Sequence, residues 1–221
     1  MLNEPTPADH PASESLDEEA SAPEPLAGKT EVEISSGRRP PIPPAQIIQL
    51  GAGFGLVMML IAAVWGTGQP DKTLGDLLAP RDLWQVIPGM IVGALGGALA
   101  FTLGKRFVSV RTIVKLLEET IDLSKLTFTH VLIISMLAAI PEEMLFRGAM
   151  QGHLGLLITS LIFGGLHAIT RTYFLYATAA GLLLGILRPM TGSLWLAIGA
   201  HFALDVVAFM FLLQREQHFI D

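Results

Sequence analysis

Long apolar stretches separated by short polar segments dominate the chain from residue 46 onward. A stretch of about twenty residues matches a hydrocarbon layer of roughly 30 Å, because an α-helix rises ~1.5 Å per residue. The apolar stretches predict six membrane helices, over 46–65, 83–104, 127–150, 154–169, 172–188 and 193–213. In the second of them the small-residue run at 93–100 predicts close helix packing.

Residues 105–125 have a different pattern, in which apolar side chains recur at helical spacing among charged ones. This spacing indicates an amphipathic helix on the membrane surface. Its apolar positions are Phe107, Val110, Ile113, Val114, Leu117 and Ile121. We therefore expect an all-α fold, a polytopic membrane helical bundle with about six transmembrane helices plus one surface amphipathic helix.

Composition divides the chain into two parts. Residues 1–44 are rich in Pro, Ala, Ser and Glu, and we expect a disordered acidic tail, because such a sequence buries little apolar area. Nine acidic and three basic residues up to Arg39 account for the whole net charge of -6, since 3 - 9 = -6. The membrane domain, 45–216, is thus near neutral, which gives no support to a nucleic-acid surface, and we expect no nucleic-acid partner. The chain has no cysteine, which excludes thiolate chemistry.

Basic residues predict the orientation, because Lys and Arg favour cytoplasmic loops. A cytoplasmic N-terminus places ten basic residues on the inner side and four elsewhere, so we expect both termini in the cytoplasm and a location in the plasma membrane. The ten are Lys29, Arg38, Arg39, Lys105, Arg106, Arg111, Lys115, Lys125, Arg171 and Arg215, and the four are Lys72, Arg81, Arg147 and Arg188.

Several ionisable residues interrupt the last four apolar stretches. A charge near the bilayer centre costs ~2.5–3.5 kcal/mol, so such residues must be paired, hydrated or protonated, and they are candidates for a functional site. Counting ~1.5 Å per residue from the turns near 152–155 and 191–193 gives depths of roughly 15 Å for Glu142, 20 Å for His167, 12 Å for His201 and 18 Å for Asp205. The four side chains are therefore expected in one layer.

Helical spacing also assigns these residues to faces. Glu143 and Arg147 are four residues apart and can form an ion pair, while Glu142 points about 100° away, toward a cavity. The imidazoles and carboxyls of the layer support two kinds of chemistry. They could hold a divalent metal such as zinc, with Glu142, His167, His201 and Asp205 as ligands. Alternatively, they could activate water directly beside an anion-stabilising group.

Three short motifs follow one another in this region: Glu-Glu-x-x-x-Arg, Phe-x-x-x-His and His-x-x-x-Asn/Asp. In this order on three membrane helices they resemble the CAAX-prenyl-protease and bacteriocin-processing (Abi-type) intramembrane endopeptidases, over about 127–209. They stand here as Glu142, Glu143 and Arg147, then Phe163 and His167, then His201 and Asp205.

The resemblance implies peptide-bond hydrolysis in the membrane, with a membrane-associated peptide or lipidated protein as substrate. Glu142 and His167 would activate water, and His201 and residue 205 would stabilise the oxyanion. Glu143, Arg147 and Phe163 would be orienting or structural. Members often carry Asn at the last position, so Asp205 is expected to be protonated, to orient His201 or to bind metal.

Two other functions are compatible with the same residues. A non-catalytic membrane adaptor or immunity protein would use the cavity for binding. A small proton-coupled transporter would use the carboxyls and histidines as a relay. The intact set of polar residues favours the peptidase, and the paired inverted repeats typical of transporters are faint here. Neither the oligomeric state nor the need for a metal follows from the sequence.

Overall fold

The computed structural model describes residues 40–66, 73–104 and 115–217. Regular structure in this part of the chain is helical, apart from one bridge between Ile42 and Ile121. The all-α prediction is therefore confirmed. The elements in chain order are α1 (Pro44–Gly66), α2 (Leu74–Leu77), η1 (Pro80–Gln85), α3 (Val86–Gly104), a short helix over 115–120, η2 (Leu123–Lys125), α5 (Phe128–Glu143), η3 (Met144–Met150), α6 (Gln151–Leu166), α7 (Arg171–Thr191) and α8 (Trp195–Gln217).

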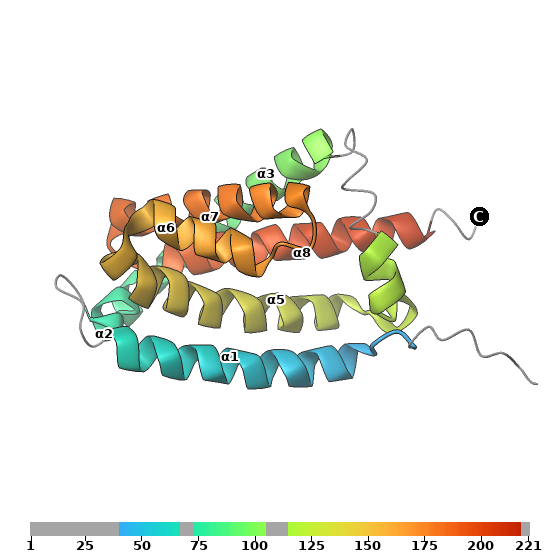
Figure 1. The fold of residues 1–221 in the computed structure, drawn as a ribbon, viewed down its shortest axis with the longest axis horizontal. Coiled ribbons are helices and arrows are strands. Elements are labelled where there is room, and N and C mark those ends of the chain that lie inside the picture. Colours follow the sequence, from blue (N-terminus) through green and yellow to red (C-terminus); the bar gives the residue numbers. More distant parts are fainter. Residues whose placement is uncertain (1–39, 67–72, 105–114, 218–221) are drawn as a thin grey trace, which may run out of the picture. The chain divides into compact units, whose positions relative to one another are not determined.

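Five helical segments of the described chain are long and apolar enough to cross a membrane. The third of these, Phe128–Leu166, is 39 residues long and reverses direction at Gly155, whose φ of 75° is incompatible with a continuous helix. It supplies both the third and the fourth predicted helices (Figure 1). The arm from Gly155 to His167 is about 18 Å long, shorter than a hydrocarbon layer, so α6 does not cross the membrane alone.

The C-terminal end of α1, α2, the Gly155 turn and the α7–α8 turn gather at one end of the bundle (Figure 1). Leu194 N donates to Leu77 O, which ties the α7–α8 turn to α2, and Trp195 Nε1 donates to Ala79 O. The Trp65 ring at the end of α1 stacks on His153 beside Gly155. The three tryptophans of the chain, Trp65, Trp84 and Trp195, all lie on elements at this end, as aromatic residues do at a membrane interface.

Glycines bring α3 and α8 into backbone contact. A Cβ added at Gly93 would lie 1.9 Å from Ala200 O, and one at Gly89 would lie 2.2 Å from Leu196 O. No side chain fits in that space, so the two backbones touch. This confirms the close packing predicted from the small-residue run, and it fixes the helix that carries His201.

The distribution of side chains is that of a membrane protein. Large apolar side chains such as Leu60 and Leu95 are exposed on the outer faces of α1 and α3, whereas Glu143 and Arg147 are buried. Exposed apolar area of this extent requires lipid to cover it. With five apolar spans, the chain is an integral membrane protein.

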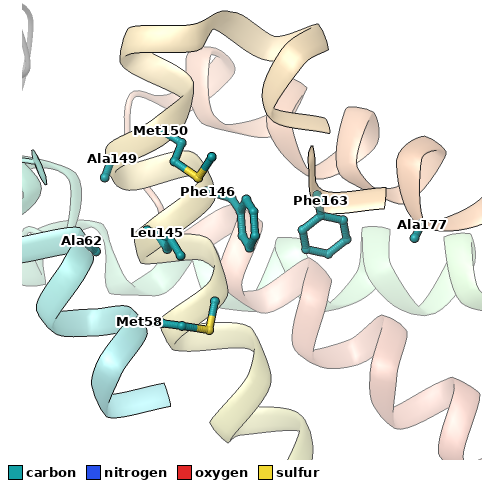
Figure 2. Packing of buried hydrophobic residues seen from close by; sticks show 8 residues of the cluster. All are labelled: Met58, Ala62, Leu145, Phe146, Ala149, Met150, Phe163 and Ala177. Carbon is teal, nitrogen blue, oxygen red and sulfur yellow. The ribbon is translucent and has the colours of Figure 1, made fainter. Parts of the chain in front are cut away.

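One buried apolar cluster joins α1, η3, α6 and α7, and Figure 2 shows its members. The Phe146 and Phe163 rings meet edge to face, with centroids 5.0 Å apart. This cluster supports the polar layer described below. Its buried residues are Met58, Ala62, Leu145, Phe146, Ala149, Met150, Phe163 and Ala177.

The predicted tail ends earlier than residue 44. Ile42 N donates to Thr120 O and Asp122 N donates to Ile42 O, and α1 begins at Pro44. The predicted disorder of residues 1–39 and the apolar positions of the amphipathic helix between 105 and 114 lie outside the described residues. In the described part of that segment only residues 115–120 are helical, whereas Ile121 forms the bridge to Ile42 and Leu123–Lys125 is a separate 3-10 turn. The predicted helix up to residue 125 is therefore too long, although Leu117 and Ile121 do pack against a buried cluster.

Candidate active site

Three helices, α5, α6 and α8, bring one carboxyl and two imidazoles together. Glu142 Oε2 of α5 lies 3.8 Å from His167 Nε2, at the C-terminal cap of α6, and 3.9 Å from His201 Nε2 of α8. Glu142 Oε2 is buried and accepts no hydrogen bond from any residue that the structure describes. The predicted single layer is therefore present.

Chain length explains why these groups meet. Glu142 stands thirteen residues before the turn residue Gly155, and His167 stands twelve residues after it. Two antiparallel helical segments of nearly equal length return the chain to nearly the same depth. His201 follows the other turn, at Gly192, whose φ is 66°.

Glu143 forms the centre of a buried polar network. Its Oε1 accepts hydrogen bonds from Arg147 Nη1 at 2.9 Å and from His201 Nδ1 at 2.8 Å. The Glu143 and Arg147 side chains are 0% and 1% exposed, so the predicted ion pair is formed, and it is fully buried. Glu143 therefore holds His201 at Nδ1, a contact that the spacing of residues in the sequence did not predict.

Arg147 and Gln151 attach this network to α7. Arg147 Nη2 donates to Gly181 O at 3.0 Å, and Gln151 Nε2 donates to Gly185 O at 2.8 Å. A side chain at Gly185 would collide with Gln151, because its Cβ would lie 2.9 Å from Gln151 Oε1. Gln151, Gly181 and Gly185 were not among the residues predicted from the sequence. Their signal is the matching spacing of four residues on each helix.

The segment that carries Arg147 is a π-helix. In η3, Met144–Met150, hydrogen bonds span five residues, and Gln151 N donates to Phe146 O at its end. Pro141 on the other side of the two glutamates removes one helical hydrogen bond of α5. Such interruptions of a helix are frequent at functional sites.

Phe163 forms the apolar floor of the site. Its ring centroid lies 4.4 Å from that of His167 and 6.0 Å from that of His201. The Arg147 guanidinium carbon lies 4.7 Å from the same ring, in a cation–π contact. Phe163 therefore packs against three of the polar side chains, and the orienting or structural role expected for it stays a prediction.

Hydrogen bonds at Nδ1 define how the two histidines present Nε2. His167 Nδ1 lies 2.8 Å from Phe163 O, and a carbonyl oxygen only accepts, so Nδ1 carries the proton. His201 Nδ1 donates to Glu143 Oε1 in the same way. Both Nε2 atoms are therefore directed at Glu142.

Asp205 lies at the edge of the layer, with Oδ2 3.6 Å from His201 Nε2 and a side chain 24% exposed. Its protonation and its role stay predictions.

The metal alternative gains no support from the geometry. Among the described residues, no group of three or more His, Cys, Asp or Glu side chains is arranged to hold a metal ion. The prediction of a metalloprotease, with zinc at Glu142, His167, His201 and Asp205, therefore has no structural basis here.

The fold and site define a class: a helical membrane protein with a glutamate–histidine centre inside the bundle. Residues 124–207 match the family described as Type II CAAX prenyl endopeptidase Rce1-like. This segment is therefore similar to that family, in agreement with the resemblance read from the motifs.

The chain is also similar to a curated protein. The protein described as "Uncharacterized protein YpbD" of Bacillus subtilis (strain 168) is 41% identical over 87 residues, which are 38% of this chain and 46% of that protein. The chain thus covers less than half of that relative's length. No solved structure matches the chain.

Proposed function

We propose that the chain is an intramembrane endopeptidase of the CAAX type, which hydrolyses a peptide bond of a membrane-associated substrate. The observation that carries the proposal is the convergence of Glu142 Oε2 with His167 Nε2 and His201 Nε2 at 3.8 and 3.9 Å. These separations are too long for direct hydrogen bonds and suit a shared water molecule.

Glu142 and His167 would activate that water. With its proton on Nδ1, neutral His167 offers a lone pair at Nε2, so both groups accept hydrogen bonds from the water and direct its oxygen lone pair at the scissile carbonyl carbon. Glu142 would take the proton as the water oxygen bonds to carbon. The same proton then passes to the leaving amine as the C–N bond breaks.

His201 would stabilise the developing oxyanion. Its Nδ1 donates to Glu143, which leaves Nε2 facing the site. When Nε2 also carries a proton, it can donate a hydrogen bond to the oxyanion. Glu143 acts through His201 by holding the ring, and Arg147 neutralises Glu143. Asp205, 3.6 Å from Nε2, limits how far the oxyanion can approach unless its carboxyl is protonated.

Orientation and substrate belong to the same proposal. The excess of basic residues in the segments expected on the inner side supports a cytoplasmic N-terminus, and we propose the plasma membrane as the location. The family of residues 124–207 supports a lipidated or prenylated CAAX-type protein as substrate.

The test is cleavage of a farnesylated CAAX peptide and an unprenylated control by the purified protein in detergent. Replacing Glu142 with Gln removes the base and keeps the shape, so we expect kcat to fall by about 10²–10⁴-fold while the unfolding temperature is unchanged. A chelator-treated sample runs beside it and is expected to keep its activity.

Full cleavage by Glu142→Gln would overturn the assignment of Glu142. Loss of activity with the chelator would restore the metal alternative. Absence of cleavage by the wild type, with specific retention of the peptide, would favour the adaptor function over the peptidase.

A further inference from the structure

The layer of polar side chains described above is rich in hydrogen-bond acceptors and poor in donors. Glu142 Oε2 and Asp205 Oδ2 lie 3.9 Å and 3.6 Å from His201 Nε2. A neutral His167 adds a further acceptor at its own Nε2. The Arg147 guanidinium already donates to two other acceptors inside the bundle. In the proposed reaction the oxyanion therefore has one donor, His201 Nε2, which two carboxyls also approach.

The Tyr173 side chain of α7 lies next to this layer and has no part in the chemistry above. Its half-buried ring has its centroid 6.5 Å from that of His167, with the two planes 62° apart. Of the surrounding charged groups, Asp205 acts on its hydroxyl most strongly and Glu142 next. Within the described chain this hydroxyl makes no hydrogen bond. A neutral phenol donates one hydrogen bond, so Tyr173 brings an unused donor to the edge of the site.

We propose that the Tyr173 hydroxyl donates a second hydrogen bond to the oxyanion, beside the one from His201 Nε2. The inference rests on the proposed peptidase function, since the oxyanion forms only when water attacks the peptide carbonyl. The carbonyl oxygen accepts from both donors as its negative charge develops, and the phenol keeps its proton throughout. A second donor also offsets the repulsion between the oxyanion and an ionised Asp205. Tyr173 is then a catalytic residue that lies outside the three motifs.

The first turn of α7 fixes the position of Tyr173. Tyr173 N donates to Thr170 Oγ1 at 3.1 Å, which caps the helix, and Phe174 N donates to Thr170 O at 2.9 Å. In the loop before this cap, Ile169 N donates to His167 O at 2.8 Å. The phenol is thus carried on a hydrogen-bonded turn that begins close to His167. Donors held in place before the reaction stabilise an oxyanion well, because they need no reorganisation as the charge develops.

Tyr176, one turn further along α7, provides a matched control. Its ring stacks on that of Tyr173 with centroids 5.9 Å apart. Among the ring contacts of the described residues, Tyr173 connects to His167, whereas Tyr176 connects to Tyr173 alone. Replacing either tyrosine by phenylalanine removes one hydroxyl and keeps the ring. The chain contains no other tyrosine, so each substitution leaves a single tyrosine in the protein.

The first experiment compares Tyr173→Phe with Tyr176→Phe in the cleavage of the farnesylated CAAX peptide. The oxyanion is absent from the bound substrate, so losing one of its donors lowers kcat and leaves KM nearly unchanged. We expect Tyr173→Phe to lower kcat by about 10²-fold and Tyr176→Phe to keep the wild-type kcat, with equal unfolding temperatures. An unchanged kcat in Tyr173→Phe, or an equal loss in both variants, overturns the proposal.

The second experiment needs no cleavage and leaves Tyr173 in place. In Tyr176→Phe, tyrosine labelled with ¹³C at Cζ gives one NMR resonance, which reports the hydroxyl of Tyr173. The probes are farnesylated phosphinic peptides, in which the phosphinate anion replaces each peptide bond of the CAAX motif in turn. The parent amide peptide, added to the same variant with Glu142→Gln, is the control without an anion.

We expect one phosphinic peptide to shift the Tyr173 resonance and the amide peptide to leave it unchanged. We also expect Tyr173→Phe to weaken the binding of that phosphinic peptide by about 10²-fold, with little change for the amide peptide. No shift at saturating phosphinic peptide, or the same shift with the amide peptide, overturns the proposal.

Together the two experiments separate this inference from the proposed function. A shift specific to a phosphinic peptide, without any cleavage by the wild type, would retain Tyr173 as an anion donor of the site and reject the peptidase. Cleavage at the wild-type rate by Tyr173→Phe would retain the peptidase and reject the role of Tyr173.

Discussion

Two ion pairs of almost equal length occur in contrasting surroundings. Arg147 and Glu143 are 2.9 Å apart in the middle of the bundle, with side chains 1% and 0% exposed. Lys125 and Asp122 are 2.8 Å apart at η2, with side chains 69% and 20% exposed. Removing one partner of a buried pair leaves an uncompensated charge, whereas solvent screens the charges of a surface pair. The distance between the two charged atoms therefore says little about how much each pair contributes to the free energy of unfolding.

The buried pair also has a second task that the surface pair lacks. Glu143 Oε1 accepts the hydrogen bond from His201 Nδ1, so the pair links bundle stability to the position of the His201 imidazole. Changes at the two pairs can separate these contributions.

The largest effect on stability is expected for Arg147→Ala. It leaves the Glu143 carboxylate buried without its cation, removes the hydrogen bond to Gly181 O and removes the contact with Phe163. We expect a loss of about 3–5 kcal/mol in the free energy of unfolding, measured by denaturant titration in detergent. Arg81→Ala, at a side chain 80% exposed, is the control. Equal stability of Arg147→Ala and the control would show that the buried pair is dispensable.

A smaller effect on stability is expected when both partners of the buried pair are replaced. Glu143→Leu combined with Arg147→Leu removes the two charges together, which is often neutral when apolar side chains fill the space. We expect the free energy of unfolding to lie within about 1 kcal/mol of the wild-type value. Cleavage of the farnesylated peptide is expected to be lost, because His201 Nδ1 then has no acceptor. Retained cleavage in this stable variant would refute the positioning of His201 by Glu143.

The smallest effect is expected at the surface pair. Lys125→Ala should leave both the unfolding temperature and the cleavage rate unchanged at neutral pH and high salt, because solvent screens the exposed charges. Hydrogen bonds from Lys125 and Ser124 lower the pKa of Asp122 from its ordinary value of 3.8. Any contribution of this pair to folding stability is therefore fully present above pH 3.8, and it is lost as the pH falls through the lowered pKa of Asp122. A large change on Lys125→Ala at neutral pH would contradict the comparison.

The axial position of each site residue could be predicted from the sequence. Residue counts from the turns fix depth along a helix, because the rise per residue hardly varies. The ion pair of Glu143 and Arg147 followed in the same way from a spacing of four residues. These predictions needed no knowledge of which helices are neighbours.

The lateral contacts could not be predicted in this way. Glu143 and His201 are 58 residues apart, and Gln151 and Gly185 are 34 apart. Helical periodicity identifies a face but not the helix that packs against it, since several apolar helices offer equivalent partners. The α3 glycines predicted a close approach, and only the structure identifies α8 as the partner.

The Gly155 turn has a consequence for how the chain tolerates insertions and deletions. Glu142 and His167 meet because the arms on either side of Gly155 have thirteen and twelve residues. Losing or gaining one residue in either arm moves one side chain about 1.5 Å along the helix and turns it by about 100°. Substitutions on the lipid-facing surface of the same arms leave this alignment intact. The hairpin therefore constrains the number of residues between Glu142 and His167 more strictly than their identity.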